Sequence, residues 1–582
     1  MLVANALVAT AQRGTTLVPA HPLFRDVASQ RGLNFSHING ASPEKFFPEI
    51  MGSGGLFLDF DNDGWLDIFL VDGGSLANAA VAGQARHRLY RNRGNGTFQD
   101  VTDMSGIRHR GYGMGACAGD IDNDGLIDLY ITGVGANSLY RNIGNGRFTE
   151  VPKAGGAEGG TWSTSCAFVD VDRDGFLDLF VTNYVDTRNA KNEFCGVSGP
   201  PPIRDYCHPL IYGPLTSTLY RNTGRGSFED ISARAGIAGH KGNGLGVAVS
   251  DIDGDGWPDV FVANDSMPNF LFHNERNGTF TEIAALAGIA VAADGKARAG
   301  MGTAFADFAD TGRPGLVVTN HETEMHSLFQ NLGGNLFSDL TVPSGVGPAT
   351  RSYVGFGVVF FDYDNDTRLD LAVVNGNVTA NAGLMRAGAT FGQRNLLLRN
   401  TGGRFVDMKD EAGPGFSGEL VSRALAAGDI DNDGDLDLLI TNNGGAANLL
   451  LNDASTSLGT GASTAVRAAP STALKPTESG STRGNALLVR AIGTKSNRSA
   501  LGARLVLTLG SRGLQREIQS GSSYLGQNDL RAHFGLGQAS RADRLEIIWP
   551  SGTREQFEDV AANQILTVEE GKGIVGRVPF TH

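Results

Sequence analysis

A nine-residue phrase rich in aspartate recurs along this 582-residue chain. Its first copy, DFDNDGWLD, begins at Asp59, and six copies keep all of their aspartates. Carboxylates at alternate positions of a tight loop suit Ca²⁺, which takes about six to eight oxygen ligands. We therefore predict a calcium loop in which residues one, three, five and nine of the phrase offer carboxylates and residue seven offers its main-chain carbonyl.

Each intact copy offers the same five ligand positions. The predicted ligands are Asp59, Asp61, Asp63, Trp65 and Asp67 in the first loop, Asp120, Asp122, Asp124, Leu126 and Asp128 in the second, Asp170, Asp172, Asp174, Phe176 and Asp178 in the third, Asp251, Asp253, Asp255, Trp257 and Asp259 in the fourth, Asp362, Asp364, Asp366, Arg368 and Asp370 in the sixth, and Asp429, Asp431, Asp433, Asp435 and Asp437 in the seventh. We expect these ions to be structural, because metal binding that closes a loop contributes folding free energy.

Two copies depart from the pattern. The degenerate fifth copy, at 307–315, has Ala309, Thr311 and Gly315 at three ligand positions, so we expect it to be empty. The sixth keeps its four aspartates but has Thr367 at the turn, where glycine would tolerate a positive φ, so we expect a weaker or strained site. The chain is thus expected to bind about six Ca²⁺ ions.

The composition agrees with a protein that holds cations. Acidic residues outnumber basic ones 62 to 48, which gives a formal charge of −14. That balance argues against a nucleic-acid binder, which needs a basic face. No run of about 18 consecutive apolar residues is present, so no membrane-spanning helix is predicted.

The elements that must position these loops also repeat. A second phrase, LYRN followed by a Gly-rich turn and a Phe-led strand, lies between the Asp copies. The Phe-led strands begin at Phe24, Phe98, Phe148, Phe228, Phe280, Phe337 and Phe405. Four short strands in each of seven repeats predict an all-β chain with a seven-bladed β-propeller, and an open solenoid is the alternative. Because the strand at Phe24 precedes every Asp loop, we predict that it completes the last blade and closes the ring.

The Asp phrase, its spacing and the LYRN phrase resemble the FG-GAP/VCBS repeats of integrin-α-like propellers, over residues 23–452. Residues 485–570 carry SNR, GAR, SGSSY, FGLG and WPSG phrases that resemble the ASPIC/UnbV domain. The resemblance implies an extracytoplasmic, calcium-binding interaction protein, secreted or periplasmic. It implies no single activity.

Three further segments complete the predicted organisation. Residues 1–22 are apolar and include Ala9-Thr10-Ala11, which indicates either a signal-peptide remnant or a plain apolar N-terminus. Residues 453–484, rich in Ser, Thr and Ala, predict a flexible linker. Short alternating runs in 485–570 predict a small β-sandwich, and residues 571–582 are expected to be a tail.

The four cysteines give two expectations. Cys195 and Cys207 lie in a Gly/Pro-rich insertion at 184–212, where a loop-closing disulfide is favoured over free thiols. Cys117 and Cys166 lie in apolar runs and are expected to be buried core thiols.

Two classes of function fit these features. The first is a calcium-stabilised scaffold that binds an unknown protein or polysaccharide through its loops, with the 184–212 insertion as the best binding surface. The alternative is a carbohydrate lyase with a site in the propeller channel and His208, His321 or His326 as base. In several repeats the strand that follows the Asp loop ends in asparagine. These asparagines either form a ring at one mouth of the propeller channel or cap turns: Asn183, Asn264, Asn320, Asn375 and Asn442.

Overall fold

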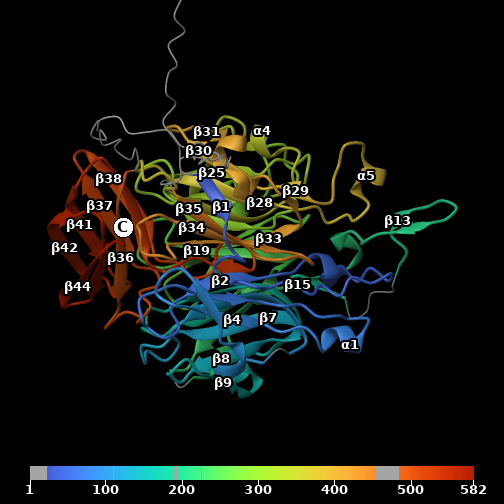
Figure 1. Cartoon of the computed structure of the whole chain (residues 1–582), viewed down its shortest axis with the longest axis horizontal. Coiled ribbons are helices and arrows are strands. Elements are labelled where there is room, and N and C mark those ends of the chain that lie inside the picture. Colours follow the sequence, from blue (N-terminus) through green and yellow to red (C-terminus); the bar gives the residue numbers. More distant parts are fainter. Residues whose placement is uncertain (1–22, 109, 188–192, 225, 454–483, 582) are drawn as a thin grey trace, which may run out of the picture.

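The computed structural model describes residues 23–108, 110–187, 193–224, 226–453 and 484–581. The chain is an all-β protein in which a β-propeller carries a β-sandwich on one side (Figure 1). The described propeller strands form seven four-stranded antiparallel groups, one for each Asp loop. Two of the groups are joined where the start of β10 (Gly159–Val169) pairs with the end of β7 (Asp128–Ala136). The expected signal remnant at 1–22 and most of the expected linker lie outside the described residues.

The first strand of each group lies next to the first strands of both neighbouring groups, so that the seven make a closed ring. In ring order they are β2 (Gly55–Leu58), β6 (Tyr112–Gly119), β10 (Gly159–Val169), β19 (Gly244–Ser250), β23 (Thr303–Ala306), β27 (Gly355–Phe361) and β33 (Ser422–Gly428). These strands are almost wholly buried, because their near-continuous apolar runs are covered on both faces.

The other strands of each group follow outward in sequence order. The second strands are β3 (Asp67–Leu70), β7 (Asp128–Ala136), β11 (Asp178–Asn183), β20 (Asp259–Asn264), β24 (Gly315–Val318), β28 (Asp370–Asn375) and β34 (Asp437–Asn442). The third strands are β4 (Arg88–Asn92), β8 (Ser138–Asn142), β16 (Thr218–Asn222), β21 (Phe270–Asn274), β25 (Ser327–Gly333), β30 (Leu396–Asn400) and β35 (Asn448–Asp453). The fourth strands are β5 (Phe98–Asp100), β9 (Phe148–Val151), β17 (Phe228–Asp230), β22 (Phe280–Glu282), β26 (Leu336–Asp339), β31 (Phe405–Asp407) and β1 (Leu23–Asp26).

The ring closes as the sequence predicts. Strand β1 pairs antiparallel with β35, and Phe24 lies opposite Asn452. The Phe24 side chain is fully buried, and its ring lies 5.4 Å from that of Phe416. The N-terminal strand therefore completes the last group, and its pairing with β35 covers an edge of that strand that would otherwise be unpaired.

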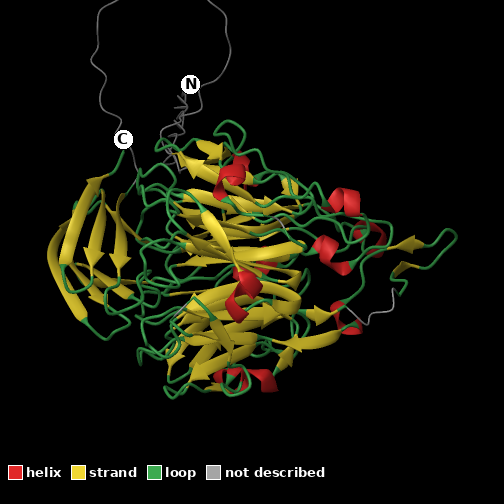
Figure 2. Ribbon diagram, turned by 90° about the horizontal axis from the view of Figure 1, so that it is seen from below, coloured by secondary structure: helices red, strands yellow, loops and turns green. Residues whose placement is uncertain are grey.

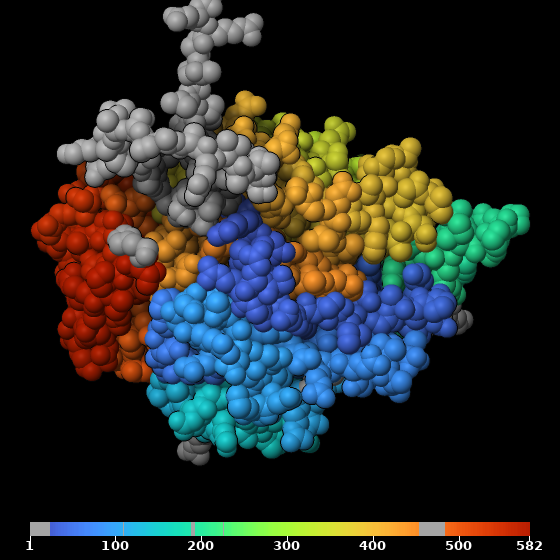
Figure 3. All heavy atoms as spheres, viewed as in Figure 1, coloured from blue at the N-terminus to red at the C-terminus, as the bar shows by residue number. Residues whose placement is uncertain are grey.

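Short elements fill the connections, most of them on the side of the ring away from the sandwich (Figure 2). The helices are α1 (Ala79–Ala82), α2 (Thr102–Ser105), α3 (Ala284–Ala287), α4 (Val346–Thr350) and α5 (Ala382–Met385). The 3₁₀ turns are Phe47–Ile50, Pro152–Gly156, Pro209–Ile211, Ile237–Gly239, Lys409–Ala412 and Pro414–Phe416. The small strands are β12 (Val185–Asp186), β13 (Gly196–Val197), β14 (Ile203–Arg204), β15 (Gly213–Thr216), β18 (Lys241–Gly242), β29 (Gln393–Arg394) and β32 (Glu419–Leu420). The β13–β14 hairpin of the insertion projects from this side (Figure 3).

The C-terminal domain is a sandwich of two four-stranded sheets. One sheet holds β40 (Ala532–Gly537), β36 (Asn485–Ile492), β43 (Gln564–Glu569) and β44 (Gly573–Pro579), and the other holds β38 (Arg512–Glu517), β37 (Arg504–Leu509), β41 (Arg541–Ile548) and β42 (Arg554–Ala561). The prediction of a tail at 571–582 is wrong, because β44 pairs with β43 along its length and so belongs to the sheet. Trp549 and Phe534 of this domain are buried.

Residues 520–529 of the C-terminal domain, which we call the axial segment, enter the centre of the first-strand ring. Its short strand β39 (Gly526–Gln527) pairs in parallel with β2. Hydrogen bonds link the segment also to β6, β10, β23, β27 and β33. The Tyr524 side chain is fully buried and donates to the Met51 carbonyl over 2.8 Å. The two domains are therefore joined through the core of the propeller as well as through the chain.

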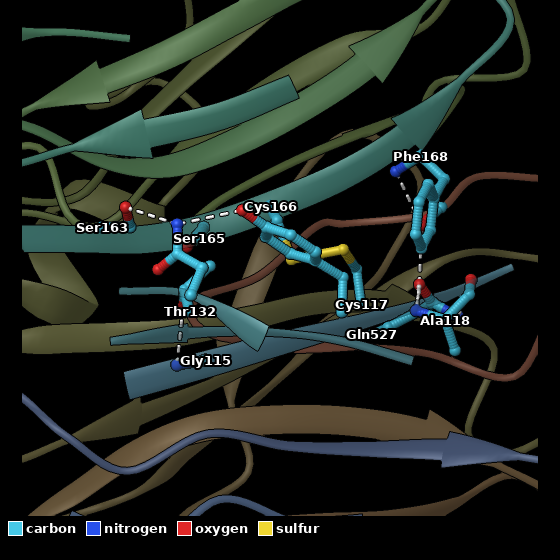
Figure 4. The surroundings of a disulfide bond; sticks show 12 residues. Gly115, Cys117, Ala118, Thr132, Ser163, Ser165, Cys166, Phe168 and Gln527 are labelled. Carbon is cyan, nitrogen blue, oxygen red and sulfur yellow. Dashed lines mark hydrogen bonds between the residues drawn. A yellow bond between two sulfur atoms is a disulfide. The ribbon is translucent and has the colours of Figure 1, made fainter. Parts of the chain in front are cut away.

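Both cysteine pairs form disulfides. The predicted Cys195–Cys207 bond is confirmed, with Cα atoms 5.2 Å apart. The expectation for Cys117 and Cys166 is half wrong: both are buried, but they are bonded to each other, with Cα atoms 5.8 Å apart. This bond joins the neighbouring first strands β6 and β10 beside Gln527 of the axial segment (Figure 4).

Candidate metal sites in the Asp loops

Each Asp loop connects the first strand of a group to its second strand, and the loops meet the C-terminal domain. In the second loop the Asp120 main-chain N–H donates to the Ser499 hydroxyl over 3.0 Å. In the first loop Arg490 lies 3.7 Å from Asp59, and in the fourth Arg504 lies 3.9 Å from Asp251. The acidic face of the propeller therefore lies against arginines of the sandwich.

The first aspartate of each loop builds the turn. The Asp59 carboxylate accepts the main-chain N–H groups of Asp63 and Gly64, both over 3.1 Å, and the same pair of bonds recurs in every loop. The turn glycine has a φ of +87° in the first loop and takes values from +74° to +93° in the other loops that have one. Glycine fits there because it has no Cβ to oppose a left-handed conformation.

Three of the four predicted carboxylates converge in most loops. Positions one, three and nine bring oxygen atoms within 4.8 Å of one another in the first, second, third and sixth loops, and positions one, three and five do so in the fourth. The fifth-position carboxylate in the first loop, that of Asp63, instead accepts the Trp65 main-chain N–H over 3.0 Å. The six seventh-position carbonyls remain predicted ligands.

The converging oxygens fit a cation. In four third-position carboxylates the Oδ1 atom is buried without a hydrogen-bond partner: those of Asp61, Asp122, Asp172 and Asp364. A buried carboxylate oxygen without a donor is costly, so a recurring one points to an ion at that place. The donor set consists of several hard carboxylate oxygens from one short loop, which suits Ca²⁺ better than the strictly octahedral, water-retaining Mg²⁺.

The electrostatics of the ion-free loops agree. Burial, opposed by main-chain hydrogen bonds and reinforced by the neighbouring aspartates, raises the pKa of Asp67 to about 9 and that of Asp128 to about 8. Burial likewise raises the pKa of Asp59 to about 6 and that of Asp170 to about 7. A divalent cation would reverse this cost, since a charge of opposite sign favours the ionised form.

The two atypical loops keep the turn. In the fifth, Asp307 accepts the N–H groups of Thr311 and Gly312 over 2.8 and 2.7 Å. In the sixth, Thr367 holds a φ of +85° and still donates its N–H to Asp362 over 2.8 Å. A β-branched residue in this region is strained, which agrees with the predicted strain of the sixth loop.

Sequence analysis missed the asparagine of the LYRN phrase. Its main-chain N–H donates to the ninth-position aspartate, as Asn92 does to Asp67 over 2.7 Å. Its side-chain amide also donates to the second residue of the preceding loop in the ring, as Asn92 does to the Ile430 carbonyl over 2.8 Å. The same amide bond is made by Asn142, Asn222, Asn274, Asn331, Asn400 and Asn452, although the loop before Asn331 has Gly315 in place of the ninth-position aspartate. Its presence at the same place in all seven repeats was the available signal.

Other candidate residues have structural roles. Asn264, Asn320 and Asn442 cap the following turns, as Asn264 does by donating to the Pro268 carbonyl over 2.8 Å. Asn183 and Asn375 instead donate to the carbonyls of Thr216 and Arg394, next to the third strand. His326 is fully buried, accepts the Asn320 N–H, and has its pKa lowered to about 3 by burial. His321 is half-buried and His208 is exposed.

Comparison with known families agrees with this architecture. The profile of the FG-GAP-like repeat matches residues 59–131, 120–181, 210–262 and 251–318. The profile described as ASPIC and UnbV matches residues 493–575. The chain therefore carries FG-GAP-like repeats and an ASPIC and UnbV domain.

Curated relatives point in the same direction. The chain is 28% identical over 350 residues to cartilage acidic protein 1 of Mus musculus and, over the same length, to that of Homo sapiens. These matches cover 59% of this chain, and the chain spans about half the length of these relatives, 47% and 46%.

Solved structures resemble the chain only distantly. One is an Agrocybe aegerita lectin that recognises non-reducing terminal N-acetylglucosamine, at 16% identity and a TM-score of 0.38, covering 68% of this chain and 86% of the lectin. Another is a Bacillus licheniformis rhamnogalacturonan lyase, at 12% identity and a TM-score of 0.35, covering 71% of this chain and 73% of the lyase. Among the described residues, no helix has the length and apolar character needed to cross a membrane.

Proposed function

We propose that this chain, built of FG-GAP-like repeats and an ASPIC and UnbV domain, is a secreted calcium-binding propeller scaffold that binds a protein or a polysaccharide. The observation that carries the calcium assignment is the recurring set of converging carboxylates, four of which leave a buried oxygen without a partner. The predicted ligands of the six intact loops would hold the ions, and the fifth loop would stay empty.

A bound Ca²⁺ would supply two positive charges to a cluster of carboxylates and link the start of the loop to the second strand. The chain's own residues set where that link acts. The ninth-position aspartate begins the second strand and accepts the N–H of the third-strand asparagine, whose amide reaches the preceding loop in the ring. Stabilising one loop should therefore stabilise the contact between neighbouring blades.

The face opposite the C-terminal domain supports the scaffold assignment. The 184–212 insertion and the segment around α5 pack together there, since Asp205 accepts the main-chain N–H groups of Ala380 and Asn381 over 3.1 and 2.8 Å. This joined surface exposes large apolar side chains: Phe194, Leu210, Ile211, Leu384 and Met385. Exposed apolar groups on a disulfide-bonded insertion are typical of an interaction surface.

Secretion is supported by two observations. All four cysteines are in disulfides, which persist in oxidising compartments. The curated relatives carry the name cartilage acidic protein.

A lyase with a channel site gains no support, because the axial segment occupies the centre of the first-strand ring and His326 is buried beside Gly355.

The proposal is tested by counting bound metal and by thermal unfolding in Ca²⁺, in Mg²⁺ and in excess EDTA. We expect about six bound Ca²⁺ and a marked drop in Tm on chelation. Asp172→Asn should remove one ion, and Asp310→Asn in the fifth loop is the matched control that should remove none. Absence of bound Ca²⁺, or a Tm that chelation leaves unchanged, would refute the calcium assignment.

A further inference from the structure

An arginine of the third strand contacts the third-position carboxylate in four blades. Arg91 Nε lies 2.5 Å from Asp61 Oδ2, and Arg221 Nε lies 2.7 Å from Asp172 Oδ2. Arg399 lies 2.7 Å from the Oδ2 atom of Asp364, and Arg141 pairs with the Oδ2 atom of Asp122. The residue is the arginine of the LYRN phrase in three of these blades, and it occupies the same place in the LLRN of the sixth.

The contact divides the two oxygens of each carboxylate. At Asp61, Asp172 and Asp364 the arginine takes Oδ2, while Oδ1 of the same aspartate is the buried oxygen without a hydrogen-bond partner. At Asp122 the arginine is ion-paired with Oδ2, and neither buried oxygen has a hydrogen bond. The same guanidinium also reaches the fifth-position aspartate, as Arg91 does to Asp63 over 3.0 Å and Arg221 does to Asp174 over 3.1 Å. A planar guanidinium that spans two carboxylates fixes the orientation of both.

We infer that Arg91, Arg141, Arg221 and Arg399 are positioning residues for the cation: each holds the outer oxygen of the third-position carboxylate so that the other oxygen faces the ion. This inference rests on the proposed calcium function, and it adds to the predicted ligands a set of residues that orient them without binding the ion themselves. Groups that orient metal ligands in this way commonly change metal affinity by about 10–100-fold when they are removed.

Blades without the arginine act as internal comparisons. The fifth blade, whose loop has Ala309 at position three, has Gln330 at the arginine's place. The fourth blade has His273 there: its Nδ1 lies 2.9 Å from the ninth-position Asp259, and its Nε2 lies 4.0 Å from the third-position Asp253. The fourth loop is also the one whose converging set contains position five in place of position nine. In the fourth blade the converging carboxylates thus differ together with this residue, and the seventh blade has Leu451 at the same place.

A different role makes the opposite prediction. If the arginine were only a resident counter-charge for an empty loop, its removal would leave the cluster more negative and would tighten cation binding. If it positions a ligand, its removal would weaken binding. The sign of the change in affinity therefore decides between the two roles.

The first loop allows a site-specific test, because Trp65 lies within it and can sensitise Tb³⁺ luminescence. The only other loop with a tryptophan is the fourth, so the test uses the full-length chain with Trp257→Phe. In that background Arg91→Leu should raise the Tb³⁺ concentration at half-maximal emission by about 10-fold or more. Arg91→Lys, which keeps the charge and one contact, should restore part of the affinity.

The matched control is Arg88→Leu. Arg88 lies on the same strand and pairs with Asp100 over 3.1 Å, away from the loop, so the titration midpoint should not move. An unchanged or lower midpoint in Arg91→Leu would overturn the inference. Should Arg91→Leu fail to fold, Arg221→Leu assayed by the number of retained Ca²⁺ ions makes the same test in the third loop.

The failure of the proposed function gives a different result. If the parent chain retains neither Ca²⁺ nor Tb³⁺ after dialysis, the calcium assignment and this inference both fail. If the parent binds and Arg91→Leu binds equally well, only the positioning role fails.

Discussion

The third and fifth Asp loops share one turn but differ at its centre. Asp170 accepts two main-chain N–H groups of its loop, each over 3.1 Å, and Asp307 does the same over 2.8 and 2.7 Å. The turn glycines have φ values of +89° and +74°. The fifth loop therefore keeps the turn although three of its predicted ligand positions are lost.

One of these differences lies at position nine. In the third loop Asp178 accepts the N–H groups of Val171 and Asn222 over 3.0 and 2.8 Å. In the fifth loop Gly315 stands there, and a Cβ on it would lie 2.4 Å from the Phe308 ring. The first aspartate and the turn glycine thus make the fold of the loop, whereas positions three and nine carry predicted ligands of a cation. The two functions can be separated by mutation.

The largest expected effect is on the pH dependence of stability. In the ion-free chain the pKa values are about 9 for Asp67 and about 8 for Asp128 and Asp429, chiefly through burial. An unfolded aspartate has lost its proton by pH 7, whereas these folded ones retain theirs, so the folded chain binds more protons and its stability must fall as pH rises. Each such carboxyl contributes about 1.4 kcal/mol per pH unit until the pH passes its folded pKa.

We therefore expect Tm in excess EDTA to fall between pH 7 and pH 9, and the fall to be suppressed in saturating Ca²⁺. The window is chosen because the neutral, buried His37 and His326, with pKa values lowered to about 3, act with the opposite sign below about pH 6.5. Differential scanning calorimetry at constant ionic strength makes the measurement. A Tm in EDTA that is flat or rises over this window would contradict the buried, protonated carboxyls.

The next prediction separates the turn from the cation site. In Ca²⁺, Asp178→Ala should cost about 3 kcal/mol, because two buried N–H groups lose their acceptor, and one bound ion should be lost. Asp307→Ala removes only a turn cap and should cost about 1 kcal/mol with no ion lost. Urea unfolding and metal counting on both variants provide the comparison. Equal ion loss in the two variants would show that the fifth loop also holds a cation.

The repeated features could be predicted from the sequence, because the same residue pattern occurs at the same place in several repeats. The Asp phrase predicts where the carboxylates converge, and the strand at Phe24 predicts the closure that β1 and β35 show. The exception is position five: local spacing cannot say that Asp63 caps the turn and pairs with Arg91.

Features that occur once could not be predicted in this way. The Cys117–Cys166 bond links residues 49 apart on neighbouring first strands, and their proximity exists only once the ring has formed. The burial of Tyr524 at the centre of the ring depends on how two domains dock, and no periodicity within the C-terminal domain encodes it. Both are long-range consequences of assembly.

A smaller effect tests whether the fifth loop can regain its missing ligand. Gly315→Asp places a Cβ 2.4 Å from Phe308 Cε1 and 2.8 Å from the Phe329 carbonyl. We expect a loss of about 2 kcal/mol from overpacking and no additional bound Ca²⁺. Metal counting and urea unfolding report the two results. An extra bound ion in this single variant would show that the Phe308 ring can move aside and that the residue at position nine alone prevents the fifth loop from binding a cation.

The smallest effect concerns the sixth loop. Thr367 holds a φ of +85°, a conformation that costs a residue with a Cβ about 1–2 kcal/mol. Thr367→Gly should relieve this strain but should also lose the contact of the Thr367 hydroxyl with Arg512 and add entropy to the unfolded chain. We expect a net gain of about 0.5–1 kcal/mol in ion-free unfolding and a tighter sixth site in Ca²⁺.

The reverse substitution supplies the control for that strain. Gly64 occupies the same turn position in the first loop at a φ of +87°, and a Cβ on it would have no neighbour within 4 Å. Gly64→Thr therefore introduces the backbone cost without a steric clash and should destabilise the ion-free chain by about 1 kcal/mol. Opposite signs in the two variants would assign the effect to the left-handed turn itself. A loss of stability in both would mean that the Thr367 hydroxyl contact outweighs the strain, and the sixth loop would then be held by the C-terminal domain rather than weakened by its turn residue.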